Sequence, residues 1–167
     1  MDLFDAITAR ASVRSLEPVD IPADDLEAIL DAGRRAPSGM NVQPLQFIVI
    51  RDRAMIEKVS KIQGFISGAS AIIAIVADEG ASTYWLEDAS AAAENMLLAI
   101  AALGYGSTWV EGTLSRREEW AKELLDVPGH LRLIIMLPIG KPTGAIAQAA
   151  KNPLSEVVHH ERFGQCG

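Results

Sequence analysis

The sequence predicts a single α/β domain, in which strands and helices alternate. Its 167 residues, 49% of them hydrophobic, are enough for one full core and too few for two ordinary domains. Residues 45–52 and 71–78 are short β-branched runs typical of buried strands, and a helical pattern at about 53–62 separates them. This alternation indicates the α/β class.

Helical periodicity predicts most of the remaining elements. Residues 2–9 and 23–36 have apolar side chains at helical spacing, and two prolines within 10–22 argue for an extended connection between them. The longest predicted helix runs from about Thr83 to Leu103. Its alanines would let another helix approach closely, in the core or at a subunit interface. Its apolar stripe comprises Leu86, Ala89, Ala93, Leu97 and Ile100.

Further strands are expected at 105–110 and 131–140, with a helix at 115–125 between them. Ser115 and Glu118 have the spacing of a capping box at the start of that helix. The chain contains no internal repeat, low-complexity tract or linker. We therefore expect one domain over residues 1–167.

Composition argues against several classes of partner. A formal net charge of -7 should repel phosphate backbones, so we expect no nucleic acid partner. The longest purely apolar run, residues 71–77, is far shorter than the ~20 residues of a membrane span, so we expect a cytoplasmic protein without a membrane partner. The single cysteine, Cys166, excludes a disulfide framework, and three histidines without further ligands nearby predict no metal site.

The segment "RASVR" could bind a phosphate. In an extended chain Arg10, Ser12 and Arg14 project to one side, where two guanidinium groups and a hydroxyl can contact one anion. The alternative is that these arginines pair with acids on the surface.

The segment "PSGMNVQP" could hold a heteroaromatic ring. Pro37, Ser38 and Gly39 form a tight corner, after which Asn41 and Gln43 offer donors and acceptors in a row. An ordinary loop between helix and strand is the alternative.

The segment "WVEGT" ends an apolar strand in a glycine. Backbone N–H groups from Val110 to Gly112 could meet the edge of a flat ligand, although a plain strand end has the same pattern. No dinucleotide fingerprint, P-loop, nucleophile elbow or zinc-protease motif occurs in the chain.

Together these segments resemble the nitroreductase family of FMN-dependent NAD(P)H oxidoreductases. The resemblance covers nearly the whole chain, because "LEAILDAGRRAPSGMNVQPLQFIVIRD", "DASAAAENMLLAIAALGYGSTWVEG" and "NPLSEVV" are similar to further family segments. It implies an α+β fold with a mostly antiparallel central sheet surrounded by helices. It also implies a homodimer whose two FMN sites lie at the subunit interface.

The resemblance also implies roles for individual residues. Arg10, Ala11, Ser12 and Arg14 would hold the phosphate and pyrimidine side of FMN, whereas Pro37, Ser38, Gly39, Asn41 and, with less support, Gln43 would reach the flavin from the other subunit. Val110, Glu111 and Gly112 would lie beside the ring. NADH or NADPH would give hydride to flavin N5, and nitroaromatics, quinones or similar small acceptors would then take its place, so no side chain need act as a nucleophile.

The chain departs from the family pattern at two places. Ala149 and Lys151 precede Pro153 where the family often has Lys and Arg, so one phosphate contact is lost and Lys151 is a weaker one, unless Lys141 compensates. The second departure is the short connection "EGASTY", which leaves the substrate pocket more open. A specialised dehalogenase or metabolite oxidase and a flavin-binding module without turnover remain as alternatives.

Overall fold

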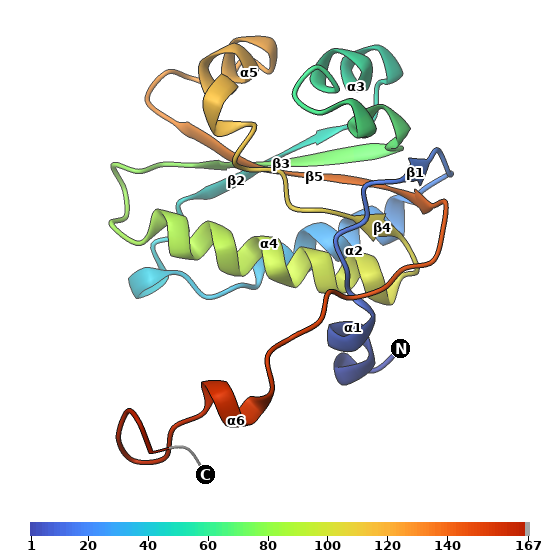
Figure 1. Cartoon of the computed structure of the whole chain (residues 1–167). Helices are drawn as coiled ribbons and strands as arrows, with labels where there is room; N and C mark the ends of the chain where they lie inside the picture. The colour runs from blue at the N-terminus through green and yellow to red at the C-terminus, as the bar shows by residue number, and fades with distance from the viewer. Residues whose placement is uncertain (166–167) are drawn as a thin grey trace.

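A five-stranded antiparallel sheet forms the centre of the protein in a computed structural model that describes residues 1–165 (Figure 1). The strand order is β1-β5-β3-β2, and β4 also pairs with β5. The strands are β1 (Leu16–Glu17), β2 (Leu45–Ile50), β3 (Ala71–Ala77), β4 (Gly106–Ser107) and β5 (Arg132–Pro142). Cys166, the predicted lone thiol, lies outside the described residues.

Helices cover both faces of this sheet. In Figure 1, α2 (Ala23–Arg34) and α4 (Trp85–Ala102) lie below it, whereas α3 (Arg53–Val59) and α5 (Glu118–Leu124) lie above it. Three short 3₁₀ turns, η1 (Gly39–Asn41), η2 (Gly64–Gly68) and η3 (Ser115–Arg117), connect elements, and α1 (Leu3–Ala9) and α6 (Leu154–Val157) lie near the two ends of the chain.

The two central strands are apolar along their length because both of their faces are covered. All seven residues of β3 are buried, and β5 is buried from Leu133 to Gly140. Residues 71–77 pair antiparallel with residues 132–139 of β5 and with β2 on the other side. The α/β class read from alternation is thereby corrected to α+β, and the antiparallel sheet implied by the family resemblance is confirmed.

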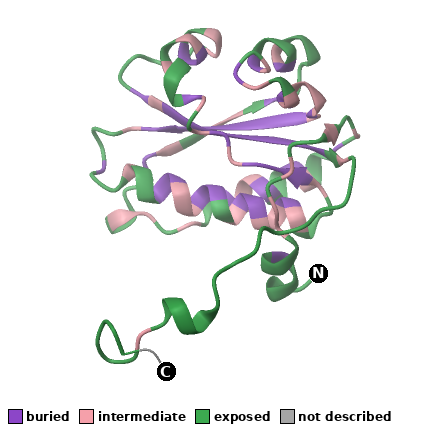
Figure 2. Ribbon diagram, in the orientation of Figure 1, coloured by how far each residue is buried: buried purple, intermediate pink, exposed green. Residues whose placement is uncertain are grey.

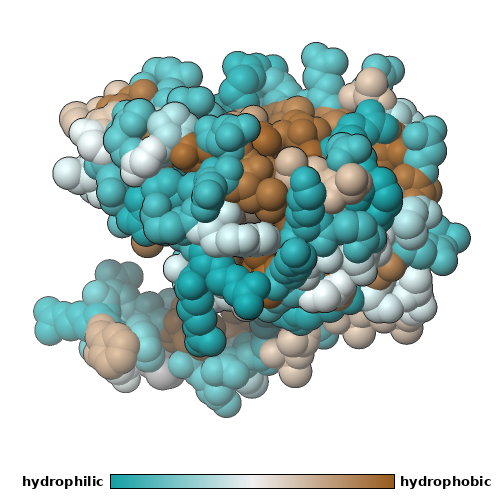
Figure 3. Space-filling view, turned by 90° about the horizontal axis from the view of Figure 1, so that it is seen from above, coloured by the Kyte–Doolittle hydropathy of each residue, from teal (hydrophilic) through white to brown (hydrophobic). Residues whose placement is uncertain are grey.

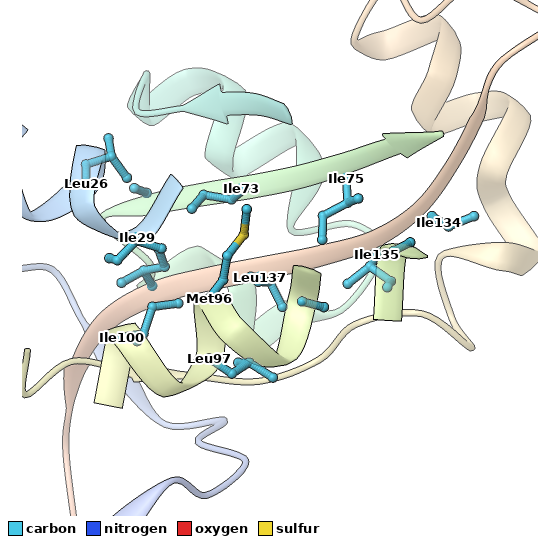
Figure 4. Packing of buried hydrophobic residues seen from close by; sticks show 14 of the residues in the cluster. Leu26, Ile29, Ile73, Ile75, Met96, Leu97, Ile100, Ile134, Ile135 and Leu137 are labelled. Atoms are coloured by element: carbon cyan, nitrogen blue, oxygen red, sulfur yellow. The ribbon is translucent and has the colours of Figure 1, made fainter. Parts of the chain in front are cut away.

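The core below the sheet depends on close contact between α2 and α4 (Figure 4). Gly33 of α2 lies against Met96 of α4, so close that a Cβ at residue 33 would overlap the thioether. The side-chain amide of Asn95 donates a hydrogen bond of 3.1 Å to the Ala32 carbonyl. Of the stripe predicted on α4, four residues are buried, whereas Leu86 is 42% exposed.

The core above the sheet is closed by α3 and α5. Seen from that side, apolar side chains gather in the middle of the face and polar ones surround them (Figure 3). Glu118 accepts hydrogen bonds from the Arg132 guanidinium and from the Leu133 N–H at 2.8–3.0 Å. The predicted capping box is wrong: Glu118 contacts β5, and the Ser115 hydroxyl donates to the Gly112 carbonyl.

The two ends of the chain are largely exposed (Figure 2). In α1 only Ala6 is buried, and the apolar residues Leu3, Phe4 and Ile7 face outward at 62%, 77% and 45% exposure. The segment after Pro142 leaves the sheet, and α6 stands away from the body below α4 (Figure 1).

Candidate functional site

The amide-rich loop has an unusual backbone. Met40, Asn41 and Gln43 have φ values of 50°, 58° and 55°, in the left-handed region that side chains other than glycine rarely occupy. Asn41 and Gln43 are exposed, and the Gln43 side-chain amide donates to the Asn41 carbonyl at 3.4 Å. The loop therefore presents amide groups to solvent from a constrained backbone.

A buried carboxylate fixes this loop to α4. Asp88, 4% exposed, accepts a 2.9 Å hydrogen bond from the Gly39 N–H and a 3.4 Å bond from the Ser82 hydroxyl. Gly39 lies so close to the Tyr84 ring that a Cβ there would overlap it. The Ser38 hydroxyl accepts from the Gln43 N–H at 3.1 Å. Pro37, Ser38 and Gln43 line a cavity of about 180 Å³ beside the loop.

The N-terminal segment lies at the other side of the molecule, next to β4. The Val13 N–H donates to the Ser107 carbonyl at 2.8 Å, and Ser12 forms an isolated bridge with Ser107. Arg10 forms an ion pair of 3.3 Å with Glu94 of α4, which matches the surface-pairing alternative for this residue. The guanidinium of Arg14 makes no hydrogen bond or ion pair with the described residues.

Two cavities border Arg14. One, of about 160 Å³, is lined by Ala11, Ser12 and the start of the C-terminal segment, residues 144–147. The other, of about 340 Å³, is lined by Val110, Glu111 and Gly112. The "RASVR" segment and the end of the "WVEGT" strand therefore come together at Arg14.

The strand end supplies free backbone donors to the larger cavity. Val110 exchanges two hydrogen bonds with Met136, of 3.0 and 2.9 Å. Beyond it, the N–H groups of Glu111 and Gly112 donate to no acceptor among the described residues. The Glu111 carboxylate accepts from the Trp109 indole N–H at 2.8 Å, so it has a partner.

The C-terminal segment passes the phosphate-binding candidates. The Gln148 side-chain amide donates to the carbonyls of Ile7 and Arg10 at 3.1 and 3.0 Å, which brings the segment of Lys151 to the end of α1. Lys141 forms a 2.8 Å ion pair with Glu17, and this hydrogen bond raises the pKa of Lys141. Its charge is therefore already matched within the chain.

One chain does not bring all predicted residues together. The cavity at Pro37, Ser38 and Gln43 shares no lining residue with the two cavities at Arg14. The loop lies near the N-terminal end of α4, whereas α1 lies below its C-terminal end (Figure 1). The predicted residues thus form two separate groups in one chain.

The structure adds residues that the sequence analysis missed. Gln63, Thr113 and Arg116 also line the larger cavity, and the Gln63 amide donates to the Thr113 hydroxyl at 2.8 Å. The hydroxyls of Ser107 and Thr108 are buried without a hydrogen-bond partner. No sequence motif marks Gln63. Arg116 could have been noticed because it is a basic residue only four positions after the predicted site residue Gly112.

Among residues 1–165, no group of three or more His, Cys, Asp and Glu side chains could hold a metal ion. In the same part of the chain, no helix is long and apolar enough to cross a membrane.

Comparisons with known proteins agree with one another. The family model described as "Nitroreductase family" matches residues 7–63 and 56–141. A protein of Archaeoglobus fulgidus with the provisional name NADH dehydrogenase/NAD(P)H nitroreductase is 40% identical over 145 residues, 81% of this chain and 83% of that protein. An iodotyrosine deiodinase of Thermotoga neapolitana is 26% identical and covers 93% of this chain and 95% of its own length.

The fold has close solved counterparts as well. The structure of an FMN-dependent nitroreductase from Clostridium difficile superposes with a TM-score of 0.86 at 26% identity, covering 96% of this chain and 99% of the other. The family model, the two relatives and the solved structure each match most of this chain. The chain belongs to the nitroreductase family.

Proposed function

We propose that this protein is an FMN-dependent oxidoreductase that passes electrons from NADH or NADPH to small acceptors such as nitroaromatics or quinones. One observation carries the proposal: the unpaired Arg14 lies between a small cavity at Ser12 and a larger one with free backbone donors at Glu111 and Gly112. A ligand with an anionic tail and a flat polar ring fits such a pair of cavities.

The residues present fit FMN group by group. Ser12 and Arg14 can bind the phosphate or the pyrimidine edge, and Arg10 can join them if it exchanges Glu94 for the ligand. Lys151 is a point charge on a neighbouring segment, and Lys141 is already paired. The free N–H groups of Glu111 and Gly112 are suited to acceptor atoms on the ring edge.

FMN, when bound, supplies the two-electron chemistry that no side chain of this site provides. Backbone donors at residues 111 and 112 would hold the ring, and Arg14 would match negative charge at its polar edge. In one turnover, NAD(P)H and one proton reduce a nitro group to a nitroso group with release of water. Because the sequence has no dinucleotide fingerprint, we expect donor and acceptor to bind one after the other in the same place beside the cofactor.

A homodimer would complete the site. The cavity beside the loop of Asn41 and Gln43 shares no lining residue with the cavities at Arg14, so we infer that a second copy supplies this loop. Exposed apolar side chains on α1 and on the C-terminal segment, including Phe4 and Leu154 at 77% and 76%, are available to bury against that copy.

The relative from Thermotoga neapolitana supports a second candidate, reductive removal of a halogen from an aromatic ring. It would use the same cofactor site and differ only in the acceptor. A flavin-binding module without turnover is the remaining candidate, since Lys151 makes the phosphate site weaker than in the family pattern.

Anaerobic reduction decides between these candidates. We expect the purified protein to release FMN on heating, and the bound flavin to bleach with NADH or NADPH and to be reoxidised by a nitroaromatic or a quinone. Arg14→Ala should weaken FMN binding by about 1.5–3 kcal/mol. Lys58→Ala should not, because Lys58 is exposed and its ammonium group makes no hydrogen bond or ion pair with a described residue. Reoxidation by a halophenol alone would favour dehalogenation, and a flavin that stays oxidised would favour the binding module.

A further inference from the structure

Two arginines of the folded body stand apart because their guanidinium groups have no hydrogen-bond or ion-pair partner among the described residues. Within residues 1–142, Arg14 and Arg116 are the arginines whose guanidinium groups make no hydrogen bond or ion pair with a described residue. The others in this range all have partners: Arg10 with Glu94, Arg34 and Arg35 with Asp31, Arg51 with Asp20 and the Ile21 carbonyl, Arg53 with Glu57, Arg117 with the Lys61 carbonyl, and Arg132 with Glu79 and Glu118.

Both unmatched arginines line the same cavity of about 340 Å³. The protein has 22 acidic and 15 basic side chains, so acidic partners are abundant elsewhere on its surface. Two guanidinium groups left unpaired at one cavity of such a protein indicate an anionic ligand there rather than a balance of surface charge.

The other polar groups of this cavity leave the arginines available. The Glu111 carboxylate already accepts from the Trp109 indole N–H at 2.8 Å. Thr113 accepts from the Gln63 amide at 2.8 Å, so its hydroxyl proton remains free to donate to a ligand. An oxyanion here would meet Arg116 and the Thr113 hydroxyl, three residues apart in the chain.

We propose that Arg116 binds an oxyanion, carboxylate or phosphate, carried by the molecule that stacks on the flavin, and so makes the site prefer anionic substrates. This inference rests on the proposed function, in which Arg14 serves FMN itself and leaves Arg116 to the second ligand. Arg116 lies in η3, four residues after Gly112, whereas Arg14 reaches the same cavity from the N-terminal segment.

The kinetic test compares matched acceptors that differ in charge. For the wild type with NADH, we expect kcat/KM for 4-nitrobenzoate to exceed that for neutral 4-nitrobenzamide by about tenfold, and the ratio to fall as salt is raised. Arg116→Ala should bring the ratio near one through KM, and Arg116→Lys should restore part of it. Lys58→Ala, which removes the same charge from an exposed site on α3, should keep the full ratio.

A second arm identifies the source of the oxyanion. If the phosphate of NADPH is the group bound, Arg116→Ala will instead lower the ratio of kcat/KM for NADPH over NADH. A loss of either ratio supports the inference, and the retention of both overturns it.

Binding by calorimetry makes the inference independent of turnover. We expect 4-nitrobenzoate to bind the oxidised wild type about tenfold more tightly than it binds Arg116→Ala, with an unchanged affinity for 4-nitrobenzamide. A flavin that NADH and NADPH never reduce would refute the proposed function, and the calorimetric comparison would still decide the role of Arg116. The inference is overturned if wild type and Arg116→Ala bind 4-nitrobenzoate equally well and the ratio of kcat/KM for NADPH over NADH is also unchanged.

Discussion

Asp88 is the residue on which the amide loop depends. A carboxylate that is 4% exposed and has no Lys or Arg partner among the described residues must be stabilised by hydrogen bonds. It receives them from the Gly39 N–H and the Ser82 hydroxyl. The same bonds hold a loop with three left-handed residues against the start of α4, so the cost of that backbone is offset at Asp88.

Asp88→Ala should therefore release the loop. We expect the free energy of unfolding to fall by about 1–3 kcal/mol, because the Gly39 N–H loses its acceptor. We also expect faster amide hydrogen exchange at Gly39 and about tenfold weaker FMN binding. Asp88→Asn keeps an acceptor oxygen and should restore most of both. Wild-type FMN affinity in Asp88→Ala would show that the loop is positioned by other contacts.

Sequence reasoning named candidate residues that share a cavity, and it missed how charges pair. It predicted Arg14, Val110, Glu111 and Gly112, which line one cavity, and the resemblance to the family supplied the link between them. It could not foresee that Glu94, 84 residues away, pairs with Arg10, or that Arg116 is left without a partner. Pairing depends on tertiary distance, and no local pattern encodes it.

At the scale of elements, the contact between α5 and β5 shows how tertiary structure overrides a local motif. Ser115 and Glu118 have capping-box spacing, yet the Glu118 carboxylate forms two hydrogen bonds with Arg132 and one with the Leu133 N–H. Arg132 also pairs with Glu79 and lies 5.1 Å from the centre of the Trp85 ring. A charged, partly buried network is stronger than one exposed cap, so the helix begins without it.

The contacts of Glu118 in this network predict how the free energy of unfolding depends on pH. Burial raises the pKa of Glu118, but the hydrogen bonds from Arg132 and Leu133 outweigh burial, so its pKa is lowered in the folded protein. A lowered folded pKa gives stability that is present above the unfolded glutamate pKa, about 4.3, and is lost as pH falls below it. Glu118→Gln should cost about 1–2 kcal/mol at pH 7 and flatten the stability curve below pH 5. Urea titrations at several pH values measure this, and parallel curves for both proteins would contradict it.

The direction of the strands was the part of the fold that periodicity could not give. Buried strands read as continuous apolar runs in parallel and antiparallel sheets alike, and β3 is buried throughout. The helix between β2 and β3 suggested alternation, but the chain passes through α3 and η2 and returns antiparallel. Element positions followed from local spacing, whereas pairing direction is a property of the whole sheet.

At the scale of the whole molecule, both ends of the chain expose apolar surface. Leu3, Phe4 and Ile7 have helical spacing but point outward from α1, and Phe163 is 93% exposed in the C-terminal segment. Each such side chain would contribute roughly 1.5–3 kcal/mol if buried. Together with the two separated groups of site residues, this distribution favours a dimer in which each copy completes the site of the other.

Subunit complementation is the sharpest test of that arrangement. One variant, Arg10→Ala with Arg14→Ala, removes cations from the N-terminal group, and another, Asn41→Ala with Gln43→Ala, removes amides from the loop. Each homodimer should bind FMN at least tenfold more weakly than the wild type. If the site is shared, a heterodimer of the two holds one site with both defects and one with neither, so it should bind one FMN per dimer at wild-type affinity. If each site lies within one chain, both sites of the heterodimer carry a defect and none binds tightly. Sedimentation of the wild type as a flavin-loaded monomer at micromolar concentration would exclude the shared site altogether.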